Sequence, residues 1–189
     1  MVHLMSRRKV PPVRTSFRFT RCKPHSCLGD KWSGRRAERI VFGFTHQEAR
    51  DRLKRYGRRP GTHENDFVHV SWLMENQPRG WSPRHPKTPI ARRIQNVVSR
   101  GLGTAPHSVR LFAAIGTYLD GLRGWDMVIG LFRGGELKAF ITVDVSARPA
   151  KRNLRADFLL SARWFWDDDV IAHLAREIRR ELCRRADAA

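Results

Sequence analysis

Two apolar runs on either side of an Arg-Gly-Gly turn constrain the fold more than any other feature of the chain. The first run covers residues 126–132 and the second residues 137–145, in which polar Thr142 and Asp144 alternate with apolar side chains. A period of two is typical of a strand, and the pair Gly134-Gly135 suits the left-handed positions of a tight turn. The sequence therefore predicts an antiparallel β-hairpin.

Further elements flank this hairpin. Thr88-Pro89 is typical of an N-cap and first helical position, and apolar residues from Ile90 to Val98 then share one face of a helix that Gly101 closes. Short apolar runs at 109–115 and 156–160 are candidate strands, and 167–185 is a second amphipathic helix with acids at its start and arginines at its end. Residues 88–189 therefore predict an α/β domain built on a central mixed sheet flanked by helices.

The first 87 residues are less regular. Residues 1–37 have no sustained periodicity, residues 45–56 predict a helix with a capping box from Thr45 to Glu48, and 67–74 is a candidate strand followed by a loop at 77–87. We therefore expect residues 1–60 to be a basic N-terminal extension, either an arm or a small subdomain. Residues 61–87 would connect it to the core at 88–189.

The charge of the chain is strongly positive and unevenly distributed. Lysines and arginines number 37 against 18 acids, and residues 1–60 hold 17 of the former and only 4 of the latter. An excess of this size favours a polyanionic partner, because each phosphate neutralised by a cation releases a counterion. We expect nucleic acid, DNA rather than RNA. The candidate phosphate contacts are Arg7, Arg8, Lys9, Arg35, Arg36, Arg55, Arg58 and Arg59.

Other classes of protein fit poorly. The apolar runs are too short for a membrane span and the N-terminus lacks the apolar core of a secretory signal, so we expect a cytoplasmic protein without a membrane partner. Cys22, His25 and Cys27 are spaced like zinc ligands, but a fourth ligand is missing nearby; zinc is therefore not expected. Phosphate-binding loops, dinucleotide fingerprints and zincin motifs are absent from the sequence.

Two acids interrupt the apolar strands of the hairpin. Asp126 is eight residues before Gly134 and Asp144 nine after Gly135, so pairing across the hairpin should bring the two carboxylates together. Adjacent carboxylates are destabilising unless a cation lies between them, and Mg²⁺ or Mn²⁺ prefers such oxygen ligands. Two simpler roles remain open: a turn, or pairing with an arginine. Asp120 is either a further ligand or a turn residue before Gly121.

In these features residues 88–185 resemble the restriction-endonuclease-like, or PD-(D/E)XK, nuclease superfamily. The resemblance lies in the order of Asp126, the hairpin turn and Asp144 within a helix-strand-strand-strand-helix-strand frame. It implies that the two acids bind a divalent metal and that a lysine two residues after the second acid assists the attacking water. Ser146 stands at that position, so Lys151 or Lys138 would have to supply the ammonium group.

The function expected from this resemblance is metal-dependent hydrolysis of nucleic-acid phosphodiesters by a DNA endonuclease, of a kind that would suit a mobile element. The alternative is a non-catalytic DNA- or RNA-binding protein, ribosomal or architectural, or an inactive nuclease fold. The missing motif lysine favours this alternative. The sequence leaves a homodimer open. The aromatic residues 164–166 suit either base stacking or burial at the junction of a strand and a helix, of which burial is expected.

Overall fold

The computed structural model describes residues 33–53, 60–102, 107–148 and 150–188. Most of the expected N-terminal arm lies outside these ranges, as do the three candidate zinc ligands. The same holds for six of the eight candidate phosphate contacts, namely Arg7, Arg8, Lys9, Arg55, Arg58 and Arg59.

The centre of the fold is a four-stranded mixed sheet in the order β1-β2-β3-β4. Its strands are β1 (His107–Ala113), β2 (Met127–Arg133), β3 (Glu136–Ser146) and β4 (Phe158–Ser161). The first three strands are antiparallel neighbours, and β4 is parallel to β3. The predicted hairpin is confirmed: β2 and β3 pair from Arg133 opposite Glu136, and Gly134 and Gly135 have φ angles of 60° and 86°.

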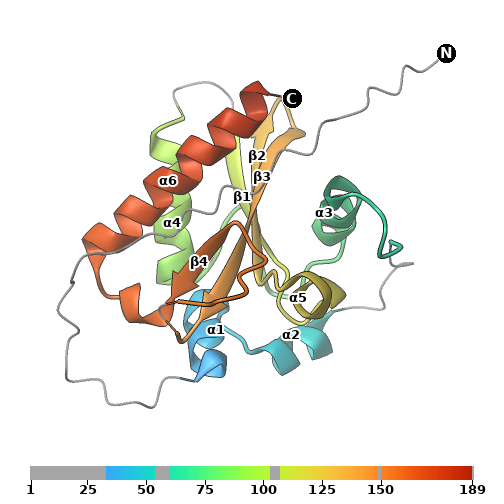
Figure 1. Ribbon diagram of the computed structural model, residues 1–189, viewed down its shortest axis with the longest axis vertical. Coiled ribbons are helices and arrows are strands. Elements are labelled where there is room, and N and C mark those ends of the chain that lie inside the picture. The colour runs from blue at the N-terminus through green and yellow to red at the C-terminus, as the bar shows by residue number, and fades with distance from the viewer. Residues whose placement is uncertain (1–32, 54–59, 103–106, 149, 189) are drawn as a thin grey trace.

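Helices cover both faces of the sheet (Figure 1). The bounds are α1 (Gly34–Phe42), α2 (His46–Arg52), α3 (Asp66–Glu75), α4 (Pro89–Arg100), α5 (Tyr118–Arg123) and α6 (Asp168–Asp187), with a 3-10 turn η1 (Ala162–Trp164) before α6. Figure 1 shows α4 and α6 on one face and α3 and α5 on the other. The predicted α/β class and its flanked mixed sheet are confirmed.

Each face of the sheet has its own hydrophobic core. The larger core lies under α1, α4 and α6 and contains Ile141, Val143 and Val145 of β3, whereas the smaller one lies under α3 and α5 and contains Phe140. Successive side chains of a strand point to opposite faces. Asp144 therefore points to the α3 and α5 face, since both of its neighbours belong to the larger core.

Residues before 88 contribute to the same fold. Ala37, Val41 and Phe42 of α1 are buried in the larger core, and the Thr88 hydroxyl at the start of α4 donates to the Val41 carbonyl. The expected boundary at residue 60 therefore does not coincide with a break in the hydrophobic core. The helix expected at 45–56 has the predicted capping box but ends at Arg52.

The strand expected at 67–74 is wrong, because these residues form α3. The Asn65 side chain accepts a hydrogen bond from the Val68 amide at 3.1 Å and starts a helix, and Val70 and Leu73, three residues apart, face the core. A short, almost wholly apolar run fits both periods, so the N-cap decides. The short helices α1 and α5 were not expected from the sequence.

The connection between β3 and β4 differs from the frame that the resemblance implies. That frame has a helix between its third and fourth strands, whereas the described residues between Ser146 and Phe158 contain none, and α6 follows β4 instead. None of the helices in the described ranges combines the length and the hydrophobicity needed to cross a membrane.

Candidate metal and catalytic site

Asp126 lies beside the part of β3 that contains Asp144. The β2–β3 pairing ends with Met127 opposite Val143, and Asp126, the residue before β2, donates from its amide to the Val143 carbonyl at 3.0 Å. A carboxylate oxygen of Asp126 accepts from the Val145 amide at 2.7 Å. Both side chains are buried. The proximity expected from counting residues back to the turn is therefore present.

The surroundings of Asp126 disfavour its negative charge. Burial raises the pKa of this carboxyl well above its ordinary value, and the nearby Asp120 and Asp144 carboxylates raise it further. The Val145 hydrogen bond and the Lys151 ammonium oppose these effects without cancelling them. A strongly shifted carboxyl among other acids is common at functional sites, where a cation or a proton completes the arrangement.

Lys151 is the lysine that reaches these acids. Its Nζ lies 2.7 and 2.5 Å from the two carboxylate oxygens of Asp144, and its side chain is 38% exposed. Lys138 is at the other end of β3, near the hairpin turn, where it pairs with Glu136 at 2.5 Å. Ser146 is buried, and its hydroxyl accepts from the Arg148 amide at 3.1 Å. Of the two candidate lysines, the structure brings only Lys151 to the acids.

Asp120 and His46 extend the site in a way that the sequence did not reveal. Asp120 lies in the first turn of α5, where its Oδ2 accepts from His46 Nδ1 at 2.7 Å and from the Gly116 amide at 3.2 Å. The alternative of a simple turn residue is therefore wrong. His46, 74 positions earlier in the chain, carries no local signal beyond its place at the start of α2.

The arrangement is suited to a hard divalent cation. Mg²⁺ is commonly bound by one or two protein carboxylates, with substrate phosphates and water completing the octahedron. Asp126 and Asp144 supply that number of ligands at a place that is short of positive charge. No group of three or more His, Cys, Asp or Glu residues suited to a metal occurs within the described ranges. Two carboxylates need no third protein ligand in this mode of binding.

Other candidate residues lie away from these acids. Arg35 and Arg36 are exposed on α1. Asp167 caps α6 by accepting from the Val170 amide at 3.0 Å, so the acids at 167–169 have the expected capping role. In the aromatic run Phe165 is buried, but Trp166 is 65% exposed, so the expected burial of the run is wrong for Trp166.

Comparisons with known proteins add nothing to this geometry. No family model matches the chain, and searches of curated proteins and of solved structures found no match.

Proposed function

We propose that the protein is a metal-dependent nucleic-acid phosphodiester hydrolase, of which DNA is the preferred substrate. The observation that carries the proposal is the juxtaposition of Asp126 and Asp144 across the hairpin with Lys151 bound to Asp144. This combination of two acids and one ammonium group is what the resemblance to PD-(D/E)XK nucleases implies. We extend that resemblance to a chain in which Lys151 replaces the motif lysine.

Each of the three residues has a role that follows from its contacts. Asp126 and Asp144 would hold the cation, and the Val145 amide fixes the Asp126 carboxylate in place. When bound, Mg²⁺ polarises a phosphoryl oxygen and lowers the pKa of a coordinated water. The Lys151 ammonium, half-exposed beside Asp144, would stabilise the negative charge that develops on the phosphoryl group.

The same geometry allows a non-catalytic alternative. Lys151 contacts both oxygens of Asp144, so the pair could serve only to neutralise a buried carboxylate, while Ser146 occupies the motif position without a charge. In that case the protein would bind nucleic acid and leave it intact.

The experiment is a cleavage assay on plasmid DNA, single-stranded DNA and RNA, with Mg²⁺ or Mn²⁺ and with EDTA. We expect metal-dependent cleavage by the wild type, with Asp144→Asn and Lys151→Met each lowering kcat about 10²-fold or more. Lys138→Met is the matched control and should retain full activity. Binding without cleavage on all three substrates would favour the alternative.

A rescue variant tests the role of Lys151 more sharply. Ser146 and Asp144 are two residues apart on one face of β3, so Ser146→Lys returns an ammonium group to the motif position. We expect the double variant Lys151→Met/Ser146→Lys to recover part of the activity that Lys151→Met loses. Inactive, folded protein in both variants would mean that Lys151 does more than supply a positive charge.

A further inference from the structure

A long stretch of the chain contains no acidic residue. Between Glu75 and Asp120 lie 44 residues without Asp or Glu, although at the average density of the chain, 18 acids in 189 residues, about four would be expected. Seven cationic residues fall in the stretch: Arg79, Arg84, Lys87, Arg92, Arg93, Arg100 and Arg110. The stretch therefore carries a local excess of positive charge, independent of the N-terminal extension.

The first part of this stretch lies along the free edge of the sheet. The Leu111 amide of β1 donates to the Pro83 carbonyl at 2.9 Å, and Trp81 Nε1 donates to the Leu111 carbonyl at 2.7 Å. Gln77 Oε1 accepts from the Ala113 amide at 2.9 Å. These outward backbone groups of Leu111 and Ala113 are thus satisfied, which protects this part of the edge strand from pairing with another chain. The segment that covers this edge presents Arg79, Arg84, His85 and Lys87 to solvent.

Helix α4 continues the same surface. Its apolar residues Ile90, Ile94 and Val98 are buried against the sheet, and its exposed side carries Arg92 and Arg100. These two arginines are eight residues apart, which at a rise of 1.5 Å per residue is about 12 Å along the helix. They lie in one stripe of the helix, since residues four apart share a face.

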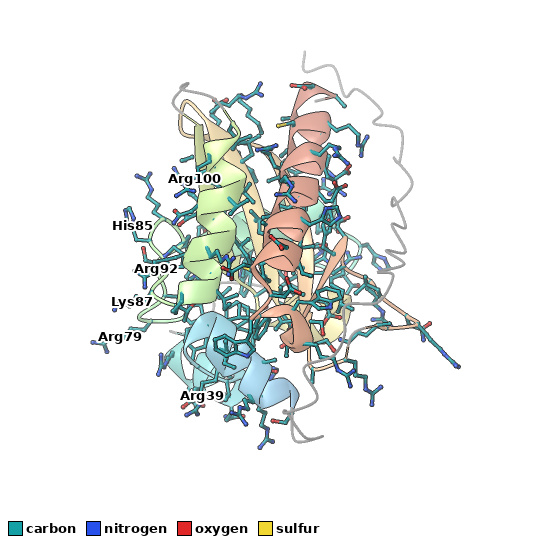
Figure 2. All side chains as sticks on the ribbon, turned by 90° about the vertical axis from the view of Figure 1, so that its left-hand side faces the viewer. Arg39, Arg79, His85, Lys87, Arg92 and Arg100 are labelled. Atoms are coloured by element: carbon teal, nitrogen blue, oxygen red, sulfur yellow. The ribbon has the colours of Figure 1, made fainter. Side chains whose placement is uncertain are left out.

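Four cationic side chains and one histidine define what we call the α4 basic surface: Arg79, His85, Lys87, Arg92 and Arg100. Figure 2 shows all five along one side of the molecule, pointing away from the sheet. Arg39 lies beyond them on α1, but it pairs with Glu48 at 2.9 Å and is not included. Within the described residues, no carboxylate is within 4.0 Å of the charged or imidazole nitrogens of these five side chains.

Helix α6 provides an internal comparison, because it covers the same face of the sheet. Three of its five arginines pair with acids: Arg180 with Glu177 at 2.7 Å, Arg184 with Glu181 at 2.6 Å, and Arg185 with Asp157 at 2.6 Å and with Glu181 at 2.8 Å. An arginine-rich composition therefore does not by itself leave arginines unpaired in this protein. Like charges gathered without counter-charges repel one another, and a polyanionic partner relieves that repulsion.

We propose that the α4 basic surface binds the phosphate backbone of duplex DNA. The choice of DNA over other polyanions rests on the proposed function. A duplex carries one negative charge per roughly 1.7 Å of axis with both strands counted, so a length equal to the span from Arg92 to Arg100 carries about seven charges. The large apolar side chains that are exposed in the described ranges all lie outside the acid-free stretch, so the surface offers contacts to phosphates and none for base stacking.

A membrane is a poorer partner for this surface. Helices that bind a bilayer insert an apolar face, and the apolar face of α4 is buried in the core. The surface is also separate from the candidate catalytic site, because α4 covers one face of the sheet and Asp144 points to the other. The α4 basic surface therefore contributes affinity and takes no part in the chemistry.

The test compares two charge-matched variants of the full chain. The first is Lys87→Gln/Arg92→Gln/Arg100→Gln on the α4 basic surface, and the control is Arg176→Gln/Arg180→Gln/Arg184→Gln on the exposed side of α6. Both lose three positive charges from exposed positions, and circular dichroism with thermal melts verifies that both are folded. Binding to a 20-base-pair duplex is measured by fluorescence anisotropy in EDTA between 50 and 200 mM NaCl.

We expect the α4 variant to bind at least tenfold more weakly at 100 mM NaCl. The slope of log K against log salt should become shallower by about 2.7, since each lost phosphate contact removes about 0.9. The control should change the slope by less than about 1. Equal DNA binding by the two variants would overturn the proposal. It would also be overturned if the α4 variant lost binding to vesicles of anionic phospholipid but kept its binding to the duplex.

The outcome is independent of catalysis. Binding is measured in EDTA, so an inactive protein in the cleavage assay does not affect it. The converse result is that the wild type cleaves DNA while the α4 variant binds the duplex as tightly as the α6 control does. That result would refute the DNA-binding role of the α4 basic surface and leave the proposed hydrolase activity intact.

Discussion

Replacing Asp126 by asparagine should make the protein more stable in the absence of metal. The carboxylate is buried next to Asp120 and Asp144, and burial is the largest cause of its raised pKa. Asparagine has nearly the same shape and keeps an oxygen for the Val145 amide, but it carries no charge. The variant therefore removes an unfavourable buried charge while it retains the hydrogen bond.

The size of the gain follows from the neighbours of Asp126. Two like charges about 5 Å apart, the usual separation of opposed side chains in a sheet, repel by roughly 3 kcal/mol at an effective dielectric constant of 20. Lys151 cancels part of the contribution from Asp144, because it binds both oxygens of that carboxylate. We therefore expect Asp126→Asn to raise the free energy of unfolding by about 1–3 kcal/mol at pH 8, or Tm by about 2–10 °C.

The stability difference between Asp126→Asn and the wild type should depend on pH. Because the pKa of Asp126 is raised in the folded protein, its contribution to stability is fully present below the ordinary value of 3.8 and is lost as the pH rises through the folded pKa. The advantage of Asp126→Asn should therefore be present at pH 8 and disappear toward pH 4. Urea unfolding in EDTA, followed by tryptophan fluorescence, measures it, with Asp187→Asn as an exposed control.

A second measurement on the same variant concerns the metal. A ligand that binds only the folded protein stabilises it by about 2.7 kcal/mol at one hundred times its Kd. Mg²⁺ should therefore raise the Tm of the wild type and leave that of Asp126→Asn unchanged. The reasoning is refuted if Asp126→Asn is destabilised equally at pH 4 and pH 8, because that result would make the carboxylate a structural cap.

Three further changes test other contacts of the fold. Gly116→Ala should lower the free energy of unfolding, measured by urea titration, by about 2–5 kcal/mol, since Gly116 has a φ of 76° and an added Cβ would lie 2.8 Å from two backbone atoms of α2. The control Gly134→Ala, with a φ of 60° and open space around it, should lower it by only about 1 kcal/mol. Asp157→Ala should cost about 2–4 kcal/mol by urea unfolding, because it leaves the buried Thr142 amide of β3 without its acceptor and removes one of the two acids that pair with Arg185 of α6. Glu181→Gln should lower stability at pH 7, and by less as the pH falls: the hydrogen bond from Arg184 is the main reason that the pKa of Glu181 is lowered, so the contribution of this carboxylate is present above its ordinary value of 4.5 and is lost as the pH falls through the lowered folded pKa. Thermal melts at a series of pH values from 7 downward measure this.

The elements that could be predicted are those whose signals are local. The hairpin has strict alternation and two glycines at its turn, and α4 has an N-terminal proline and a closing glycine, so their positions follow from neighbouring residues. Helix α3 could not be predicted in the same way. Its apolar run fits either period, and the decision lies in one side-chain hydrogen bond from Asn65.

Some contacts of the candidate site could likewise be predicted from the sequence, and others could not. Asp126 and Asp144 could be paired from the sequence because the hairpin turn fixes which positions face each other. The contact of His46 with Asp120 depends on how α2 packs against α5, and the choice of Lys151 over Lys138 depends on where the residues after β3 place the Lys151 side chain. Neither contact follows from the spacing of residues in the sequence, because each depends on how segments outside the two strands of the hairpin pack in three dimensions.

The charge distribution connects the two proposals. In a chain of net charge +19, Asp120 and Asp126 form a local concentration of negative charge, and they begin where the acid-free stretch ends. A phosphate drawn to the protein by its arginines would still be repelled at these acids, and Lys151 compensates only Asp144 directly. A divalent cation at the two opposed carboxylates would remove that repulsion. DNA should therefore bind to the α4 basic surface with or without metal, whereas a phosphate should approach Asp126 and Asp144 only when metal is present.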